Sequence, residues 1–291
     1  MLASFRGYAT SMFGWVVDKY PNLFIVVRDN LPRADIRVAY RTYMSMVFFL
    51  TSFIYIISLL ATIVALSIIP LSIVMRVVFI LFVPLVNSVV AFVVFSFYPI
   101  QKSTSRKKNI ETNLPFVLTH IGAIAESGVP PYVVFRLIGQ FKEYGEISTE
   151  MRKITKNIED FGIDPLSAIR EIAERSPSET FKQVLLGYIS ATEAGGNVKL
   201  YLKEVGEKTL FDWRIKREKF LQQLSTYAEF YTGLLIAAPL FIISLFSVMG
   251  MIQPTISGYN ILDLMKMSIY LVVPILNGAF LLFLKGIEVE I

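Results

Sequence analysis

The sequence lacks cysteine altogether and has a single histidine, His120, in 291 residues. The absence of cysteine excludes disulfides, zinc–thiolate sites, iron–sulfur clusters and a thiol nucleophile. A lone histidine excludes sites that need two, and we interpret His120 as a polar residue packed in a helix beside Thr119. The sequence also lacks a glycine-rich loop ending in Gly-Lys-Ser or Gly-Lys-Thr, the P-loop that holds nucleotide phosphates. We therefore expect no catalytic residues, no metal, no cofactor and no enzymatic activity.

Charged residues are also scarce, at 18% of the chain against roughly 25% in an ordinary soluble domain, whereas 54% of the residues are hydrophobic. The apolar residues form four long runs, each near the roughly 20 residues that cross a hydrocarbon core. All four are predicted to be helices, because lipid offers no partners to backbone amides. The runs cover about residues 44–69, 77–98, 230–252 and 267–284. The sequence thus predicts an all-α, polytopic membrane protein.

Lysine and arginine are unevenly distributed around these runs, which predicts their orientation. Six of them precede the first run, while the connections 70–76 and 253–266 hold one each. Two further clusters lie at the ends of the long middle segment, namely Lys102, Arg106, Lys107 and Lys108, then Arg214, Lys216, Arg217 and Lys219. We therefore expect a multi-pass protein of the cell membrane with both termini and the middle segment in the cytoplasm.

This organisation divides the chain into four parts. They are a cytoplasmic N-terminal amphipathic segment, a first pair of transmembrane helices, a cytoplasmic helical-bundle domain and a second pair of transmembrane helices. Their expected bounds are 1–43, 44–98, 99–227 and 228–291.

The middle segment has the periodicity of a soluble helical bundle. Apolar residues recur from Ile147 through Met151 and Ile154 to Phe161 with the spacing of one buried helical face. Six helices are predicted, the first beginning at Leu114-Pro115 and the last running without interruption into the third apolar run. The acidic pairs between these helices are interpreted as solvated faces, namely Glu143 with Glu146, Glu159 with Asp160, and Glu171 with Glu174.

Helix ends in this segment are marked by turn and cap residues. Asp164 before Pro165 predicts a helix start, and Ser176 before Pro177 predicts another, with Glu179 completing a capping box. Glycine marks the helix stops. The residues assigned to bundle turns are Gly128, Pro130, Gly162, Asp164, Gly195 and Gly196.

The order of four motifs resembles the cytoplasmic domain of the type II secretion F-protein family. The motifs are Leu114-Pro115, the turn 127–130, the turn 161–164 followed by Ala168, and the stop 193–196. Members of this family are platform proteins of type II secretion systems, type IV pili, Tad pili and the archaeal flagellum. The bacterial pattern has two such domains in tandem, whereas this sequence has one, as in the Tad and archaeal branches.

The resemblance implies a platform that couples a cytoplasmic secretion ATPase to insertion of pilin-like subunits and filament assembly. It also implies a homodimer, or a heterodimer with a sister platform subunit. The alternative function is a membrane transporter or channel subunit with a regulatory cytoplasmic domain. Such a protein should carry ionisable groups or broken helices at mid-membrane. Here only Glu229, at a membrane boundary, and two Pro-Asn pairs are available.

Two groups of residues are candidates for function. The basic residues are expected to contact either the ATPase or anionic lipid, and they are Arg106, Lys107, Lys108, Arg214, Lys216, Arg217 and Lys219. The near balance of basic and acidic residues in the middle segment argues against nucleic acid. The second group is a repeated Val-Pro-x-x-Asn pattern that gives Pro84 and Asn87 in one apolar run and Pro274 and Asn277 in another. These residues are expected either to pack the spans or to act as hinges.

Overall fold

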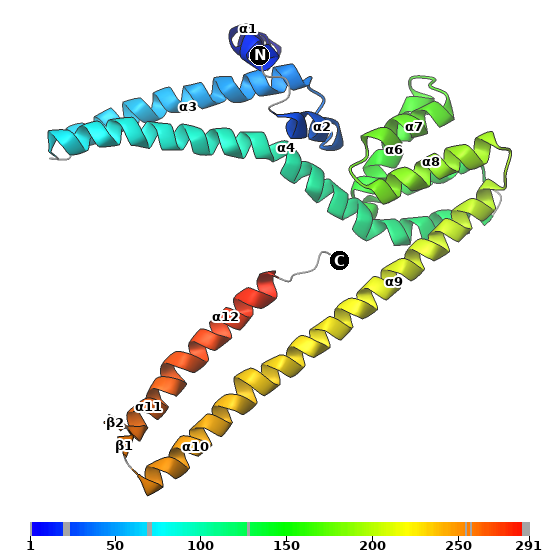
Figure 1. Ribbon diagram of the computed structural model, residues 1–291. Coiled ribbons are helices and arrows are strands. Elements are labelled where there is room, and N and C mark those ends of the chain that lie inside the picture. The colour runs from blue at the N-terminus through cyan, green and yellow to red at the C-terminus, as the bar shows by residue number, and fades with distance from the viewer. Residues whose placement is uncertain are drawn as a thin grey trace. The chain divides into compact units, whose positions relative to one another are not determined.

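The computed structural model describes residues 2–19, 24–68, 72–126, 129–253, 255–256 and 258–286. It is almost entirely helical (Figure 1), and four of its helices are long and apolar enough to cross a membrane. The expectation of an all-α, polytopic membrane protein is therefore confirmed. The chain divides into two compact units, Met1–Glu207 and Lys208–Ile291, and each is described separately below.

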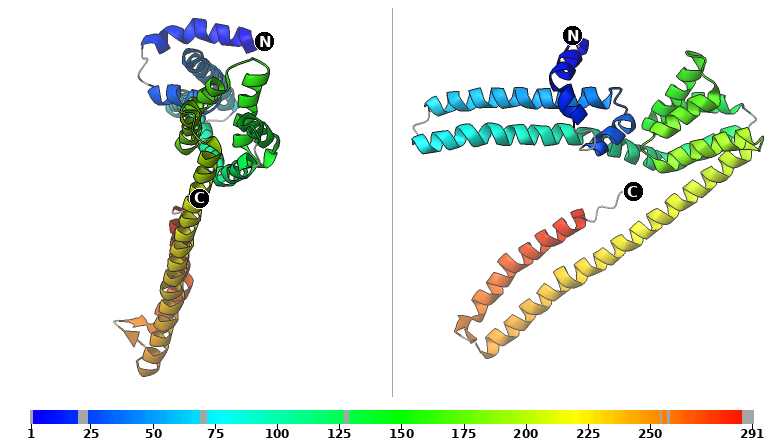
Figure 2. Two further views of the ribbon diagram at one scale, coloured as in Figure 1. Left: turned by 90° about the vertical axis from the view of Figure 1, so that its right-hand side faces the viewer. Right: turned by 45° about the horizontal axis from the view of Figure 1, so that its top comes forward.

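The first unit begins with two helices packed on a membrane hairpin. The elements are α1 (Leu2–Lys19), α2 (Ile25–Arg33), α3 (Tyr40–Ile68) and α4 (Ile73–Glu126), and α3 runs beside the first half of α4 (Figures 1 and 2). Phe48 on α3 and Phe92 on α4 meet with ring centroids 5.5 Å apart, and Phe24 packs edge-on against Phe92. Val27 and Met44 are buried beside these rings. The N-terminal segment is thus docked on the hairpin by an apolar core of its own.

Helix α4 is longer than the sequence predicts. It continues from the second span into the bundle and contains Pro84, Pro99 and Pro115 in its interior, so the expected helix start at Leu114-Pro115 is wrong. Proline is tolerated inside a helix when neighbouring groups take over the carbonyl that it frees. The second span and the first helix of the bundle are therefore one element, and α4 bends between its two halves (Figure 1).

The bundle is completed by helices that pack on the C-terminal half of α4. They are α5 (Pro131–Gln140), a 3-10 turn (Lys142–Tyr144), α6 (Glu146–Glu159), α7 (Pro165–Arg175), α8 (Glu179–Glu193) and the start of α9 (Val198–Phe230). Their core includes Ile110, Leu118, Ile138, Met151, Ile169, Phe181 and Leu202. The face predicted for α6 is buried at Ile147, Met151 and Ile154, as its spacing indicates.

The turns around α7 and α9 follow the sequence prediction. Gly162 has φ 63° and Gly195 has φ 65°, the left-handed conformation that ends helices. The Asp164 carboxylate accepts a 3.0 Å hydrogen bond from the backbone N–H of Ser167 and caps α7. The backbone N–H of Gly196 bonds the Ala191 carbonyl at 2.9 Å, closing α8. Pro130 precedes α5 directly, whereas Gly128 lies outside the described residues.

The start of α8 differs from the prediction by two residues. Ser178, not Ser176, caps this helix, because its hydroxyl accepts the backbone N–H of Phe181. Ser176 instead ends α7 and exchanges hydrogen bonds with the backbone of Ser178. Glu179 is consequently the first residue of α8 and not the fourth member of a capping box. The two serines flank one proline, so local rules alone choose wrongly between them.

The second unit is a membrane hairpin. From Val198 to Ile252 the chain is helical throughout, as predicted for the last bundle helix, and includes a π-helical segment at Tyr231–Ala237 before α10 (Ala238–Ile252). The return leg comprises α11 (Ile261–Met267), a π-helical segment (Ser268–Val272) and α12 (Val273–Gly286). Strands β1 (Thr255–Ile256) and β2 (Tyr259–Asn260) pair in an antiparallel turn between the legs, which the sequence analysis did not anticipate.

Candidate functional site

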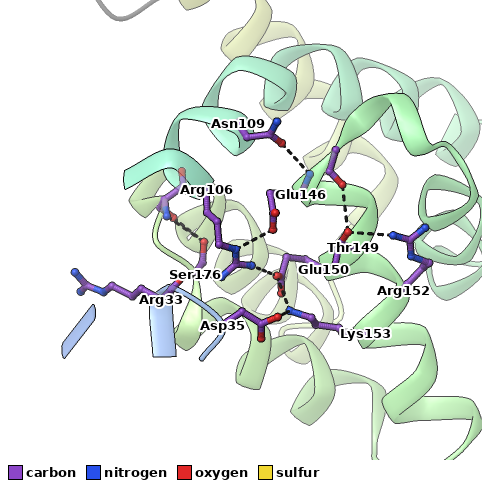
Figure 3. Close-up of polar contacts among 12 residues, drawn as sticks. Arg33, Asp35, Arg106, Asn109, Glu146, Thr149, Glu150, Arg152, Lys153 and Ser176 are labelled. Carbon is purple, nitrogen blue, oxygen red and sulfur yellow. Dashed lines mark hydrogen bonds and ion pairs between the residues drawn. The ribbon is translucent and has the colours of Figure 1, made fainter. Parts of the chain in front are cut away.

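An ionic cluster joins the N-terminal segment to the bundle, and Arg106 of α4 is at its centre (Figure 3). Arg106 is only 6% exposed. Its Nε donates a 2.8 Å hydrogen bond to Glu146, and its two terminal nitrogens bond Glu150 and the backbone carbonyl of Arg33. The planar guanidinium therefore joins α4 to α6 on one side and to the end of α2 on the other. We call Arg33, Asp35, Arg106, Glu146, Glu150 and Lys153 the ionic junction.

Lys153 extends the junction to the loop that leads into the first span. Its ammonium lies 2.9 Å from Glu150 and 2.8 Å from Asp35. Asp35 has φ 54°, a left-handed conformation that is uncommon for a residue with a side chain but tolerated best by Asp and Asn. The loop between α2 and α3 is thus held in an unusual backbone conformation by a charge on α6.

The protonation states of the junction follow from its contacts. Burial disfavours the charged form of Arg106, but the hydrogen bond to Glu146 and the charges of Glu150 and Glu146 outweigh it and raise its pKa. Burial likewise raises the pKa of Asp35, but the hydrogen bond and charge of Lys153, with the charges of Arg106 and Arg37, lower it below the usual value. Both shifts favour the charged forms, so the contacts of the junction stabilise the Arg106 cation and the Asp35 anion.

A cap from α4 holds α6 in position for these contacts. The Asn109 side-chain carbonyl accepts a 2.8 Å hydrogen bond from the backbone N–H of Glu146, at the first turn of α6 (Figure 3). Gly145 precedes it with φ 58°, and a Cβ there would meet the Asn109 amide at 2.4 Å. The close approach requires glycine at this position, and it places Glu146 and Glu150 on the face of α6 nearest Arg106.

The structure corrects the sequence prediction that Arg106 contacts the ATPase or anionic lipid. Its guanidinium is buried and engaged within the protein, so it has no free surface to offer a partner. Glu146 is likewise no solvated acid, because it is bonded to Arg106. Lys107 and Lys108 remain exposed, with Lys107 4.0 Å from Glu111.

The second basic cluster lies on α9 within the second unit. Arg214, Lys216, Arg217 and Lys219 are all exposed there. The Arg217 guanidinium lies 5.6 Å from the centre of the Trp213 ring, a cation–π distance. Contact of these exposed residues with the ATPase or with lipid stays a prediction.

Two glycines let α4 and α9 pack backbone to backbone in the bundle. A Cβ at Gly206 would lie 2.8 Å from the Leu118 carbonyl oxygen, and one at Gly122 would lie 3.3 Å from the Lys203 Cα. Lys203 also bonds Glu126 at 2.6 Å beside this crossing. The last helix of the bundle is thus fastened to the first at a point where side chains are excluded.

In each membrane hairpin, the asparagine predicted on one helix forms a hydrogen bond with a side-chain hydroxyl on the other helix. The Asn87 amide donates a 2.8 Å hydrogen bond to the Ser58 hydroxyl of α3. In the second unit, the Asn277 side-chain oxygen accepts a 3.3 Å hydrogen bond from the Tyr231 hydroxyl. These contacts are what helix packing requires of a buried amide in lipid. Pro84 lies within unbroken α4, whereas Pro274 is the second residue of α12, so the fourth span departs from regular α-helix just before it, at Ser268–Val272.

The side chain of His120 contacts that of Tyr144 in the structure. The His120 ring is exposed, and its Nδ1 shares a hydrogen bond with the Tyr144 hydroxyl. Among the described residues, no group of three or more His, Cys, Asp or Glu side chains could hold a metal ion.

The sequence analysis missed most of the junction. Glu150 directly precedes Met151 of the predicted buried face of α6, and Lys153 follows three residues later. Two adjacent charges on an apolar helical face are a signal for a buried ion pair, because such groups are rarely buried alone. Nothing in the sequence indicates their remote partners Asp35 and Arg106.

Comparison with known proteins gives one family and three relatives. The model of the type II secretion system protein F family matches residues 117–246. An uncharacterized protein of Methanocaldococcus jannaschii is 24% identical over 193 residues, which are 65% of this chain and 32% of that relative. Flagella accessory protein J of the same organism is 22% identical over 174 residues, or 60% of this chain and 30% of the relative.

Flagella accessory protein J of Methanococcus voltae is 21% identical over 175 residues, again 60% of this chain and 30% of the relative. The chain thus spans about a third of the length of the curated relatives that it matches. No solved structure matches it.

Proposed function

We propose that the chain is the membrane platform of a filament-assembly machine related to type II secretion systems and type IV pili, because residues 117–246 match the type II secretion system protein F family in a chain with four helices able to span a membrane. In this role it couples a cytoplasmic secretion ATPase to the insertion of pilin-like subunits. It acts as a structural transmitter and catalyses no reaction itself.

The observation that carries the proposal is the continuity of two helices. Helix α4 includes both a span and the first helix of the bundle, and the stretch 198–252 includes both the last helix of the bundle and the next span. The chain is therefore helical at both of these connections between the bundle and a span. A force applied to such a domain reaches the spans through helices, which is what a mechanical platform needs.

The ionic junction adds a third connection, from the bundle to the loop before the first span. Lys153 holds Asp35, and Arg106 holds the Arg33 carbonyl, a few residues before α3 begins. Three of the four spans are thus tied to the bundle by a continuous helix or by buried charges. The fourth span is connected to the third through the turn between α10 and α11.

We further propose that the ATPase docks on exposed basic residues, namely Lys107, Lys108, Arg214, Lys216, Arg217 and Lys219. Their exposure supports this assignment, and electrostatic steering of an acidic rim would weaken with salt. Lipid contact by the same residues is the competing outcome. We also propose that the chain works as a dimer with itself or a sister subunit, since pairing supplies the second domain present in the bacterial pattern.

The orientation is proposed with both termini and the bundle in the cytoplasm, from the lysine and arginine distribution. A reporter inserted within residues 141–147 should behave as cytoplasmic, and one within 254–262 as external. An external bundle would overturn the orientation and, with it, any contact with a cytoplasmic ATPase.

The decisive experiment is deletion and complementation in the native host. Loss of the gene should abolish one class of surface filament, and the wild-type gene should restore it. A neighbouring gene for a secretion ATPase with a P-loop, together with a pilin-like precursor, identifies the machine to examine. Unchanged filaments and secretion in the deletion strain would overturn the proposal, as would ATP turnover by the purified protein free of partners.

A further inference from the structure

Two cavities flank the loop between α2 and α3. One, of about 220 Å³, has Arg106 and Lys153 of the ionic junction in its wall. The other, of about 530 Å³, opens between α2, this loop and the end of α7. We call the larger one the interfacial cavity; its lining includes Arg28, Leu31, Ile36, Arg37, Tyr40 and Arg175.

The interfacial cavity has an excess of positive charge. Its three arginines come from three elements: Arg28 from α2, Arg37 from the loop and Arg175 from the last turn of α7. The acid in its lining, Asp35, is already held by Lys153 at 2.8 Å. Two arginines of the N-terminal segment and one of the bundle therefore line the same cavity. The Asp35 carboxylate in this lining already has Lys153 as its partner.

The ion pairs that these arginines make are weak ones. Arg37 is 78% exposed, and its Nε lies 4.0 Å from Asp35. Arg28 pairs with its chain neighbour Asp29 at 3.4 Å, and Arg175 with Glu171 one turn away at 3.0 Å, both on the surface. Exposed pairs of this kind contribute about 0–1 kcal/mol, so an added anion can compete for the arginines at little cost.

The remaining wall is apolar and includes an unsatisfied hydroxyl. Leu31 is buried, and Ile36 packs with it against the N-terminal core. The Tyr40 hydroxyl is buried and has no hydrogen-bond partner among the described residues. Burying a hydroxyl without a partner costs about 1–3 kcal/mol, which a bound acceptor would recover.

One side of the interfacial cavity is formed by the loop residues that directly precede the first predicted span. Helix α3 begins at Tyr40, and the apolar run begins about four residues later, a rise of roughly 6 Å along the helix. The headgroup layer on each side of a hydrocarbon core is about 5–7 Å thick. This spacing places the end of the loop, with Arg37 three residues before Tyr40, near the expected depth of lipid phosphates.

We propose that the interfacial cavity binds the phosphate of an anionic phospholipid, held by Arg28, Arg37 and Arg175 and by a hydrogen bond from Tyr40. The guanidinium fork matches phosphate geometry, which favours arginine over lysine at such sites. The bound lipid bridges α2 and the loop to α7, and so reinforces the ionic junction from the membrane side. The inference needs membrane insertion only, so it stands or falls separately from filament assembly.

The test is native mass spectrometry of the full chain purified in detergent, with phosphatidylglycerol or phosphatidylcholine added. The wild type should retain a single phosphatidylglycerol in preference to phosphatidylcholine. Arg37→Gln with Arg175→Gln should weaken retention by about tenfold or more, equivalent to about 1.4 kcal/mol. Tyr40→Phe should weaken it less, because it removes a neutral donor and leaves the charges.

The matched control is Arg136→Gln with Arg170→Gln, which removes two exposed, ion-paired arginines elsewhere on the same domain. It should retain lipid like the wild type. Arg37→Gln alone is the control for misfolding. Its side chain is so exposed that the variant should keep the wild-type melting temperature, so weaker lipid retention would not reflect unfolding.

Three results would overturn the proposal. Equal loss of lipid in the control pair and the cavity pair would show non-specific charge attraction. Displacement of the lipid by millimolar inorganic phosphate, which then binds alone, would assign the site to a soluble phosphate. Displacement by a poly-glutamate peptide that the cavity variants no longer bind would assign it to an acidic protein segment.

Discussion

The Tyr43 hydroxyl of α3 donates a 2.7 Å hydrogen bond to the backbone carbonyl of Phe95 on α4. Phe95 lies four residues before Pro99, so its carbonyl is the one that would accept a helical hydrogen bond if residue 99 had an N–H. A side chain from the neighbouring span thus replaces the bond that proline removes. This contact accounts for the continuation of α4 through Pro99 from the membrane into the bundle.

Tyr43→Phe should destabilise the protein because it leaves this carbonyl without a partner in a partly buried position. The expected loss is about 1–3 kcal/mol in the free energy of unfolding. Pro99→Ala supplies the missing N–H, so Tyr43→Phe should cost much less in that background. A double-mutant cycle of unfolding in detergent measures the difference, and an equal cost of Tyr43→Phe in both backgrounds would refute the explanation.

Arg106→Gln should loosen the N-terminal segment from the bundle, because it leaves Glu150 partly uncompensated in a buried site. The expected cost is about 3 kcal/mol, at the lower end for a broken buried pair since Lys153 still contacts Glu150. Hydrogen exchange should accelerate in residues 24–43 more than in α8.

Lys107→Gln is the matched control for this change, since it removes the neighbouring exposed charge and should cost less than about 1 kcal/mol. Adding Glu150→Gln to Arg106→Gln should recover part of the loss by removing the unpaired charge. Equal exchange rates in wild type and Arg106→Gln would show that the junction does not hold the segment.

Acid should weaken the junction through Asp35, whose pKa is lowered in the folded protein. A group with a lowered pKa stabilises the fold above its unfolded value, about 3.9, and loses that contribution as pH falls through the folded value. The stability difference between wild type and Asp35→Asn should therefore be constant above about pH 5 and shrink below about pH 4. Asn tolerates the left-handed backbone at this position, so the variant changes charge alone. Thermal unfolding across pH 3–7 checks this, and a difference that persists to the lowest pH contradicts it.

Gly206→Ala should destabilise the bundle although alanine favours helix, because its Cβ would lie 2.8 Å from the Leu118 carbonyl oxygen. Overpacking of this kind costs about 1–3 kcal/mol. Gly7→Ala in α1, where nothing lies within 4 Å, should be neutral or gain up to about 1 kcal/mol. Melting temperatures of the two variants in one detergent compare them directly. A gain for both would mean that the α4–α9 crossing has room for a methyl group.

Charge reversal at Arg214, Lys216 and Arg217 tests the proposed ATPase docking. Glu at all three positions should abolish filament assembly and ATPase binding, while the protein remains folded and inserted, because the side chains are exposed. Binding should weaken as salt rises in the wild type. If Gln supports assembly and even Glu leaves ATPase binding unchanged, the cluster serves as a lipid anchor or a topology signal.

The sequence by itself determined the features that depend on neighbouring residues in the chain. The apolar runs indicate four spans because crossing lipid requires a certain length of apolar helix. Gly162 and Asp164, like Gly195, end and begin helices through backbone conformation and local caps, and these turns occur as predicted. The choice of Ser176 over Ser178 failed because two equivalent caps lay two residues apart.

Only the tertiary structure decided the features that need a partner from elsewhere in the chain. Pro99 and Pro115 signal helix boundaries locally, yet both lie within α4; at Pro99 a hydroxyl 52 positions from Phe95 satisfies the freed carbonyl. Arg106 belongs to a basic cluster in sequence, but acids 40 and 44 positions away draw it into the interior. The energy of an ion pair or a hydrogen bond depends on distance in space, which sequence spacing does not give once the separation exceeds a helical turn or two.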